Sequence, residues 1–167
     1  MSLKPFSPDI PAYVLTVIIL GDWLRIMVVK LQSKSETETK EIGRRLGEKL
    51  KPGDVVCLYG ELGAGKTTMV KGIASAVGIN ERDITSASFT IIAEHNGPIP
   101  FYHIDLYRVQ PREIDDIGLY EYLGRDGISV IEWAERAEKE IPDGSIKVRF
   151  NYAGEDSREI EIEGIEL

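Results

Sequence analysis

One short segment of the sequence carries a complete motif for binding a phosphate chain. Residues 60–67 read GELGAGKT and match the pattern G-x-x-x-x-G-K-[ST] at every fixed position. Glycines permit tight turns whose backbone N–H groups point at an anion, and the N-terminus of a following helix adds further N–H groups. The segment predicts a loop for ATP, with the Lys66 ammonium on the β- and γ-phosphates and the Thr67 hydroxyl on Mg²⁺. The expected nucleotide contacts are Glu61, Leu62, Gly63, Ala64, Gly65, Lys66, Thr67 and Thr68.

Such a site also needs an acid that holds the metal ion and a group that orients the attacking water. Asp105 ends the apolar run FYHID, and Glu132 ends the run ISVIE. The carboxyl ends of parallel strands meet at the sheet edge where nucleotides bind, so both acids are candidate catalytic groups together with Lys66. We expect Glu132 to share the metal ion with Thr67. Either acid could orient the water, and a helix cap or a surface charge is the alternative role for each.

Four further positions have a functional and a structural interpretation. His103 could sense the nucleotide or move a proton, or it could be structural. Trp133 could stack on a base, meet a partner or fill the core. Ser88 lies with Ser86 in a polar segment that could order around the γ-phosphate as a switch, or that could be an ordinary loop. Arg108 could reach a phosphate or be solvated.

The elements that position these groups alternate along the chain. Apolar runs predict buried strands over residues 54–59, 101–106 and 127–131, and residues 85–93 predict an extended loop running into a strand. Apolar residues at helical spacing predict helices over residues 35–50 and 67–77, the first of them opened by a capping box of Ser35 and Glu38. We also expect a short helix over residues 114–123 and a charged helix over residues 133–140 that Pro142 stops. Strict alternation over residues 146–152 and 160–162 predicts a closing antiparallel hairpin at an edge of the sheet.

This order of elements predicts the fold class. Strands that alternate with helices indicate an α/β protein with a largely parallel sheet, and the C-terminal antiparallel hairpin makes the sheet mixed. With the phosphate-binding loop between a strand and a helix, the expected architecture is the three-layer sandwich of P-loop NTPases.

Length and composition limit the classes of protein to which the chain can belong. The 167 residues suit one compact domain, and 43% hydrophobic with 29% charged residues is typical of a globular protein. The net charge of −8 argues against a protein that grips nucleic acid alone, because such proteins have a basic face. The single cysteine, Cys57, lies in an apolar run and fits a buried position in a protein of the reducing cytoplasm.

The N-terminal segment is atypical. Val14–Leu20 is an apolar run too short to span a bilayer, and the segment lacks the pattern of a signal peptide, so we expect no membrane association. It could be an added strand or a loosely ordered arm, or the natural start could be Met27. We therefore treat residues 1–30 as an N-terminal extension and residues 31–167 as a single P-loop ATPase domain.

Four segments together resemble a known family. GELGAGKTT at 60–68, SASFT at 86–90, FYHIDLYR at 101–108 and VIEWAER at 130–136 have the order and spacing of the bacterial TsaE (YjeE) family. The resemblance covers residues 31–150. The phosphate-binding loop is generic, whereas HIDLYR followed by IEW is specific to the family.

The resemblance implies a small P-loop ATPase needed for N6-threonylcarbamoyladenosine at position 37 of tRNA. It implies two partner proteins, TsaB and TsaD, with tRNA reached only through their complex and with TsaD carrying the transfer chemistry. Lys66 and Thr67 match the family's nucleotide loop, Asp105 its H-x-D acid, Glu132 its magnesium-site acid and Trp133 the tryptophan that follows.

The sequence departs from the family's pattern in the polar segment of residues 86–89. The family's usual S-P-T-F appears here as residues 86–89, with Ala87 in place of proline and Ser88 in place of threonine. Alanine loosens the loop, while serine keeps the hydroxyl.

Two other functions share a phosphate-binding loop. A small-molecule kinase would need a second substrate pocket and usually a lid with several arginines, whereas the arginines here are scattered. A non-catalytic, nucleotide-dependent binding module would not require the set of Lys66, Thr67, Asp105 and Glu132. We expect slow ATP hydrolysis by the chain alone, because the sequence has no obvious arginine finger.

Overall fold

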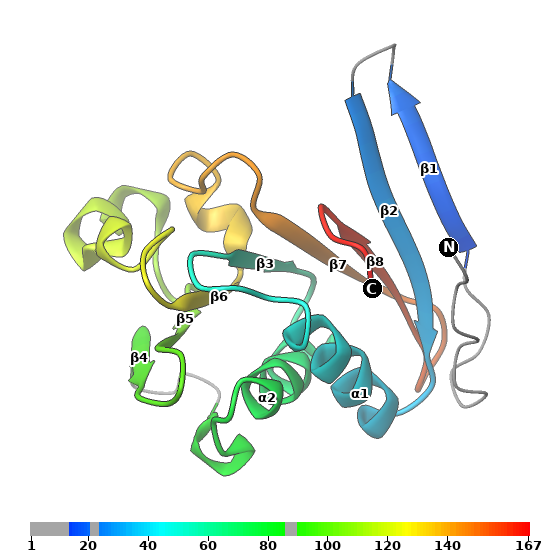
Figure 1. Cartoon of the computed structure of the whole chain (residues 1–167), viewed down its shortest axis with the longest axis horizontal. Coiled ribbons are helices and arrows are strands. Elements are labelled where there is room, and N and C mark those ends of the chain that lie inside the picture. Colours follow the sequence, from blue (N-terminus) through cyan, green and yellow to red (C-terminus); the bar gives the residue numbers. More distant parts are fainter. Residues whose placement is uncertain (1–13, 21–23, 86–89) are drawn as a thin grey trace.

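The computed structural model describes residues 14–20, 24–85 and 90–167, which form one sheet flanked by helices (Figure 1). The strands are β1 (Val14–Leu20), β2 (Leu24–Ser33), β3 (Val55–Tyr59), β4 (Ile92–His95), β5 (Phe101–Asp105), β6 (Ile128–Glu132), β7 (Ile146–Tyr152) and β8 (Arg158–Glu163). The described helices are α1 (Glu36–Gly47) and α2 (Lys66–Ala76), with short 3₁₀-helices η1 (Glu81–Asp83), η2 (Pro111–Glu113), η3 (Asp115–Ile117), η4 (Leu119–Glu121) and η5 (Ala134–Ala137). Within these ranges, no helix has the length and apolar character needed to cross a membrane.

The sheet is mixed, as expected. Its strand order is β1-β2-β8-β7-β3-β6-β5-β4. The four strands β7, β3, β6 and β5 run parallel, and the outer neighbours pair antiparallel. The α/β fold class and the C-terminal hairpin are therefore confirmed.

The expected edge position of that hairpin is wrong. Strand β7 pairs with the central strand β3, and β2 covers the remaining edge of β8, so the hairpin lies inside the sheet. The apolar run Val14–Leu20 is a strand, one of the interpretations of the N-terminal segment, and it pairs with β2 along its whole length. The sequence interpretation missed β2.

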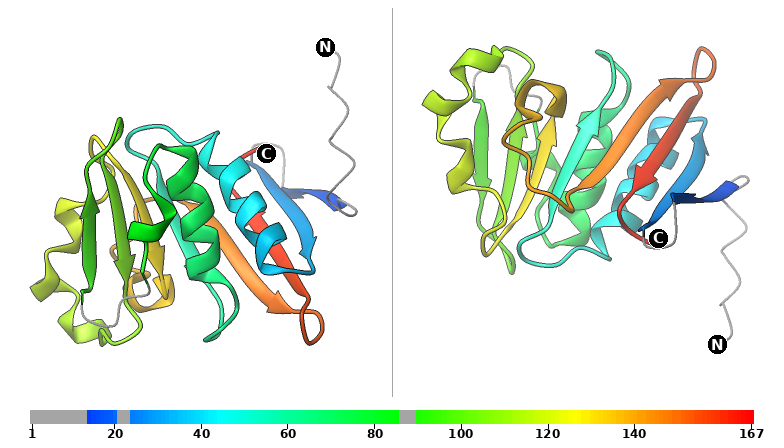
Figure 2. Two further views of the ribbon diagram at one scale, coloured as in Figure 1. Left: turned by 90° about the horizontal axis from the view of Figure 1, so that it is seen from below. Right: turned by 90° about the horizontal axis from the view of Figure 1, so that it is seen from above.

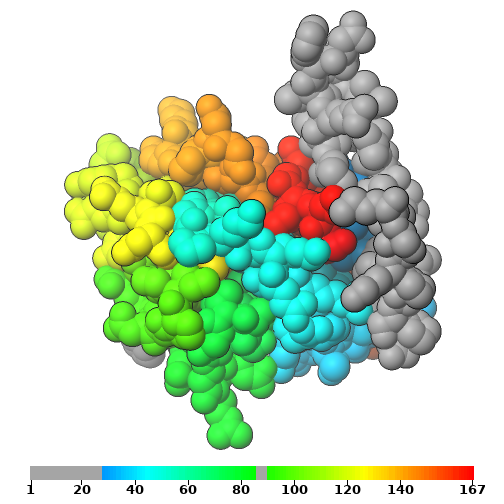
Figure 3. Space-filling view, viewed as in Figure 1, coloured from blue at the N-terminus to red at the C-terminus, as the bar shows by residue number. Residues whose placement is uncertain are grey.

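Alternate side chains of the central strands face two separate cores. On β3, Val56 and Leu58 belong to the core under α1 and α2, while Val55 and Cys57 belong to the core under the 3₁₀-helices. Figure 2 shows the two α-helices side by side on one face of the sheet. The last residues of the chain, red in Figure 3, pack against the first core. The α-helices, the sheet and the 3₁₀-helices therefore form three layers, as predicted.

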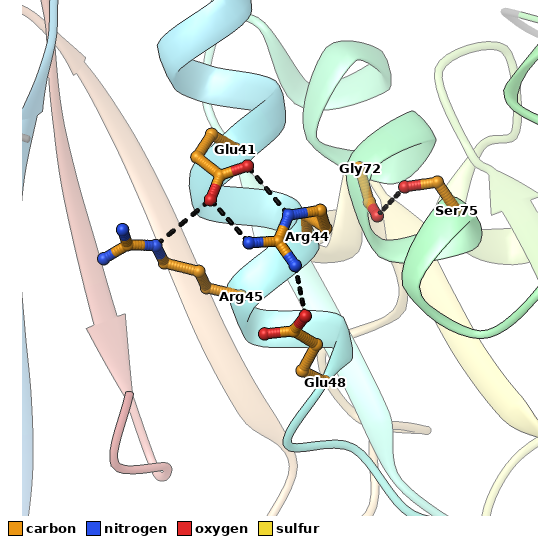
Figure 4. Close-up of polar contacts among 6 residues, drawn as sticks. All are labelled: Glu41, Arg44, Arg45, Glu48, Gly72 and Ser75. Carbon is orange, nitrogen blue, oxygen red and sulfur yellow. Dashed lines mark hydrogen bonds and ion pairs between the residues drawn. The ribbon is translucent and has the colours of Figure 1, made fainter. Parts of the chain in front are cut away.

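Helices α1 and α2 approach each other closely because glycines line their contact. A Cβ on Gly43 would lie 2.4 Å from the carbonyl oxygen of Met69, and a Cβ on Gly72 would lie 2.1 Å from that of Lys40. The Gly72 carbonyl in turn accepts a hydrogen bond of 2.8 Å from the Ser75 hydroxyl (Figure 4). A side chain larger than that of glycine therefore does not fit at Gly43 or at Gly72.

The start and the outer face of α1 follow local rules. The Ser35 hydroxyl accepts a 3.1 Å hydrogen bond from the Glu38 N–H, which confirms the N-cap half of the predicted capping box. The reciprocal half is wrong, because the Glu38 carboxylate accepts from the N–H of Lys34 and not from that of Ser35. On the outer face, Glu41 pairs with two arginines of the helix, as Figure 4 shows. These ion pairs are partly exposed and contribute little, so packing against α2 and the sheet holds the helix.

Two of the expected α-helices are wrong. The segment expected at 114–123 forms η3 and η4, which Gly118 separates with a φ of +67°. The segment expected at 133–140 forms only η5, and Arg136 N–H donates to the Trp133 carbonyl three residues back. The left-handed Gly118 interrupts an α-helical hydrogen-bond ladder between η3 and η4, whereas in the second segment the left-handed Trp133 lies at the N-cap of η5.

Candidate functional site

The loop of residues 60–65 joins the end of β3 to the first turn of α2. Its backbone needs glycine at both ends. Gly60 has a φ of +147°, and a Cβ there would lie 3.0 Å from Phe150 Cβ, while Gly65 has a φ of +104° and forms the N-cap of α2. The strand–loop–helix context predicted for the motif is confirmed. It aims the free N–H groups of a helix N-terminus at one point above the sheet.

Lys66 is folded into this loop. Its Nζ donates to the carbonyl oxygens of Gly60 at 2.6 Å and Glu61 at 2.8 Å, and it lies 4.1 Å from the ring centroid of Trp133. The residue is only 4% exposed. Burial lowers the pKa of Lys66 below its usual 10.5, and nearby carboxylates, chiefly that of Glu132, oppose this shift. An anion bound in the loop would therefore meet a cation that is already partly desolvated.

Glu132 and Thr67 form the centre of the site. The Thr67 hydroxyl lies 2.9 Å and 3.0 Å from the two carboxylate oxygens of Glu132, so it donates to that carboxylate. Behind it, His103 Nε2 lies 2.8 Å from Glu132 Oε1, and both side chains are buried. The predicted end-of-strand position of Glu132 is confirmed, and the histidine's observed position is that of a support beneath the acid.

Asp105 lies beside Glu132 because β5 and β6 are parallel and place these two residues in register. Its Oδ1 accepts a 2.9 Å hydrogen bond from the N–H of Tyr107, which turns the chain after β5. Tyr107 then packs against Trp133 with ring centroids 4.9 Å apart. Trp133 itself has a φ of +59°, a strained backbone for a residue other than glycine.

These groups surround a cavity of about 530 Å³. The predicted residues that line it are Leu62, Gly63, Ala64, Gly65, Lys66, Thr67, Thr68, Asp105, Glu132 and Trp133, and Arg108 lines it as well. Glu61 is exposed beside it and contributes its carbonyl to Lys66, and His103 lies beneath it. Ser86 and Ser88 lie outside the described residues.

Sequence reasoning missed two contributions to the site. Tyr107 lines the cavity, and the signal for it was the turn that must follow Asp105. On the far side of the loop, the Tyr152 hydroxyl donates to the Leu62 carbonyl at 2.9 Å, and Arg158 Nη2 lies 3.5 Å from the Gly63 carbonyl. No local pattern predicts these contacts, because about ninety residues of chain separate the partners.

The oxygen atoms of the site are of a kind that suits a hard cation. A hydroxyl and a carboxylate are ligands that Mg²⁺ prefers, and Mg²⁺ typically takes few protein ligands beside phosphates and water. Within the described ranges, no group of three or more His, Cys, Asp or Glu residues is placed to hold a metal ion by itself. The Thr67 hydroxyl and the Glu132 carboxylate therefore fit a magnesium ion whose other ligands would be phosphate oxygens and water.

A glycine-rich loop that connects a central strand to a helix, at the carboxyl edge of parallel strands, defines a P-loop NTPase fold. The family model "Threonylcarbamoyl adenosine biosynthesis protein TsaE" matches residues 33–160. The chain belongs to the TsaE family.

Individual relatives agree with this assignment. The chain is 43% identical over 133 residues to the tRNA threonylcarbamoyladenosine biosynthesis protein TsaE of Bacillus subtilis, covering 79% of this chain and 83% of the relative. It is 40% identical over 131 residues to the protein of the same name from Treponema pallidum, covering 78% and 96%. Among solved structures, the crystal structure of Bacillus subtilis YdiB superposes with a TM-score of 0.70 at 38% identity, covering 84% of this chain and 88% of that one.

Proposed function

We propose that this chain binds ATP with Mg²⁺ and hydrolyses it to support the formation of N6-threonylcarbamoyladenosine at position 37 of tRNA. The observation that carries the proposal is the hydrogen bond from the Thr67 hydroxyl to the Glu132 carboxylate beside the phosphate-binding loop. It joins the metal-binding hydroxyl of the motif to a buried acid from another strand. The names of the relatives supply the tRNA modification.

In this proposal each residue has a stated role. The loop N–H groups hold the phosphate chain, and Lys66 moves from the Gly60 and Glu61 carbonyls to the β- and γ-phosphates. Thr67 and Glu132 hold Mg²⁺, the acid directly or through water, and the ion supplies charge stabilisation when bound. Asp105, in register with Glu132 on the next strand, orients the attacking water.

We propose TsaB and TsaD as the partners, and tRNA as a substrate reached through their complex. The net charge of −8 supports this, since an acidic protein gains little from direct contact with the tRNA backbone. A partner would also complete a site that turns over slowly alone. The cytoplasm, where tRNA is modified, is the proposed compartment.

The test is ATP turnover by the purified chain, alone and then with TsaB, TsaD and tRNA, together with the yield of modified tRNA. We expect a low rate that rises sharply with the partners. Thr67→Ala should abolish the rise and the modification, while Lys71→Ala, on the same helix but outside the cavity lining, should leave both intact.

Two results would replace the proposal. Full support of the modification by Thr67→Ala would favour a binding module in which nucleotide only sets shape. Phosphate appearing on a small acceptor instead of as free phosphate would favour a kinase.

A further inference from the structure

His103 lies beneath the nucleotide cavity and is not part of its lining. It comes two residues before Asp105 on β5, opposite Val130 in the register with β6. From there its Nε2 reaches across to Oε1 of Glu132, at 2.8 Å, and both side chains are 3% exposed. The proposed function gives Glu132 a role at the metal ion and leaves this buried contact without one.

The two oxygens of the Glu132 carboxylate differ in their contacts. A carboxylate only accepts hydrogen bonds, so Nε2 of His103 donates to Oε1. The Thr67 hydroxyl lies 2.9 Å from Oε1 and 3.0 Å from Oε2, and it has a single proton to share between them. Oε1 is therefore the anchored oxygen, while Oε2 keeps more capacity to ligate an ion or to accept from a water bound to it.

Lys66 competes with the metal ion for this acid. Both Lys66 and Glu132 line the cavity, and of the carboxylates near Lys66 that of Glu132 has the largest electrostatic effect on it. Among the ion pairs of the described residues, however, Glu132 is joined to His103, and Lys66 Nζ donates to two loop carbonyls instead. A pair between Lys66 and Glu132 would neutralise the cation that the phosphates need and occupy the acid that the ion needs.

We infer that His103 is a positioning residue for the proposed reaction: its Nε2–H holds Glu132 by Oε1, which leaves Oε2 for the metal ion and keeps the acid away from Lys66. The inference rests on the proposed function and deepens it. A glutamate side chain has several rotatable bonds, and the contact with His103 orders it before a nucleotide binds. His103 thus acts through Glu132 and touches neither the nucleotide nor the ion.

The place of His103 in the sheet suits such a support. Strand β5 is paired on both edges, with β4 on one side and β6 on the other, so the sheet fixes the backbone that carries the imidazole. Groups that hold a metal-binding side chain in place typically contribute about 10–100-fold to metal affinity or activity. An effect of this size is within reach of binding measurements.

Nitrogen-15 NMR of the nucleotide-free protein tests the hydrogen bond itself. The sequence has two histidines, His95 and His103, so the imidazole signals can be assigned with the variant His95→Gln. We expect Nε2 of His103 to carry a proton that exchanges slowly with water. A His103 ring protonated on Nδ1 alone would overturn the inference, because Nε2 could not then donate to Glu132.

Calorimetry with the non-hydrolysable ATP analogue AMPPNP, in Mg²⁺ and in EDTA, tests the effect on the site. The phenyl ring of His103→Phe has no donor, so we expect the gain in affinity that Mg²⁺ provides to fall about tenfold. His103→Gln keeps an N–H donor and should stay within about threefold of the parent. His95→Gln, on β4 and outside the cavity lining, is the matched control and should bind like the parent.

A double substitution separates positioning from packing. In EDTA, the acid released in His103→Phe should pair with Lys66 and weaken AMPPNP binding about fivefold. Adding Glu132→Gln should restore this binding, because no charge is then left to pair with Lys66. An equal loss with and without Glu132→Gln, or a response of His103→Phe to Mg²⁺ like that of the parent, would overturn the inference.

ATP hydrolysis by the parent distinguishes failure of this inference from failure of the proposed function. If the parent bound AMPPNP with a response to Mg²⁺ that depends on His103 but released no phosphate from ATP, the proposed hydrolysis would fail and the role of His103 would stand. If the parent hydrolysed ATP and His103→Phe changed neither the rate nor the response to Mg²⁺, the role of His103 alone would fail.

Discussion

The Thr67 hydroxyl donates to a carboxylate, that of Glu132, which comes from a strand sixty-five residues further along the chain and is itself buried. Strands β3 and β6 are parallel neighbours, and Leu58 lies opposite Glu132 in their register. The first turn of α2 therefore begins directly above the end of β6. The sheet topology, and not the loop alone, brings the two proposed magnesium ligands together.

Replacing the acid should separate binding from hydrolysis. In Glu132→Gln the loop and Lys66 still hold the phosphates, so we expect nucleotide affinity to change less than about tenfold while kcat falls about a hundredfold. Calorimetry with ADP and single-turnover ATP hydrolysis measure the two effects. Glu140→Gln, an exposed acid outside the cavity lining, is the control. A collapse of affinity in a folded Glu132→Gln protein would contradict the assigned role.

The buried pair of His103 and Glu132 should contribute to stability as a unit. Both side chains are 3% exposed, so removing His103 leaves the buried Glu132 carboxylate with only the Thr67 hydroxyl among these two partners. We expect His103→Ala to lower the free energy of unfolding by about 3 kcal/mol, and by much less when Glu132→Ala is already present. Urea unfolding of the four proteins in this cycle measures the coupling. Equal losses in both backgrounds would show that the two groups do not interact energetically.

The sequence predicted the parts of the site that depend on local chemistry. The loop, the capping of α1 by Ser35 and the two strand-end acids follow from residue type and spacing, and the structure has each of them. The order of the strands in the sheet could not be predicted from such local signals. The pairing of β8 with β2 joins segments more than a hundred residues apart, and an alternating pattern in one strand does not name its neighbour.

The errors in the 3₁₀ segments have a related cause. Residues 134–137 place Ala134 and Ala137 in the second core, a spacing that serves a 3₁₀-helix as well as an α-helix. Trp133, which precedes this turn with a left-handed backbone, packs against Tyr107 and lies 4.1 Å from Lys66 Nζ. Those contacts are tertiary, so periodicity within the segment did not reveal them.

Under the proposed function, the lowered pKa of Lys66 should give nucleotide binding a pH dependence. Burial lowers this pKa in the nucleotide-free protein below 10.5, whereas bound phosphates favour the charged amine. Binding therefore takes up a proton where the free protein has lost it, and ATP affinity should fall as the pH rises through the lowered pKa. Between the lowered pKa and 10.5, Lys66 carries a proton in the unfolded chain but not in the folded one. The free energy of unfolding should therefore increase with pH across this interval.

Calorimetry in two buffers of different ionisation enthalpy would detect the proton uptake. Lys66→Arg keeps a positive charge that does not titrate in this range, so its affinity should stay flat with pH even if it is lower overall. A parallel fall in Lys66→Arg would assign the pH dependence to another group.

The contact between α1 and α2 predicts an unusual response to an alanine substitution. Alanine in place of a helical glycine normally stabilises by about 0.5–1 kcal/mol, because it restricts the unfolded chain. At Gly72 the new Cβ would lie 2.1 Å from the Lys40 carbonyl oxygen, which is backbone and cannot rotate away. We expect Gly72→Ala to lower the free energy of unfolding by about 2 kcal/mol, with Lys71→Ala close to neutral, in urea melts. Since α2 starts at Lys66, the helix displacement should also weaken ADP binding, and a stabilised Gly72→Ala protein would show that the helices are not packed this closely.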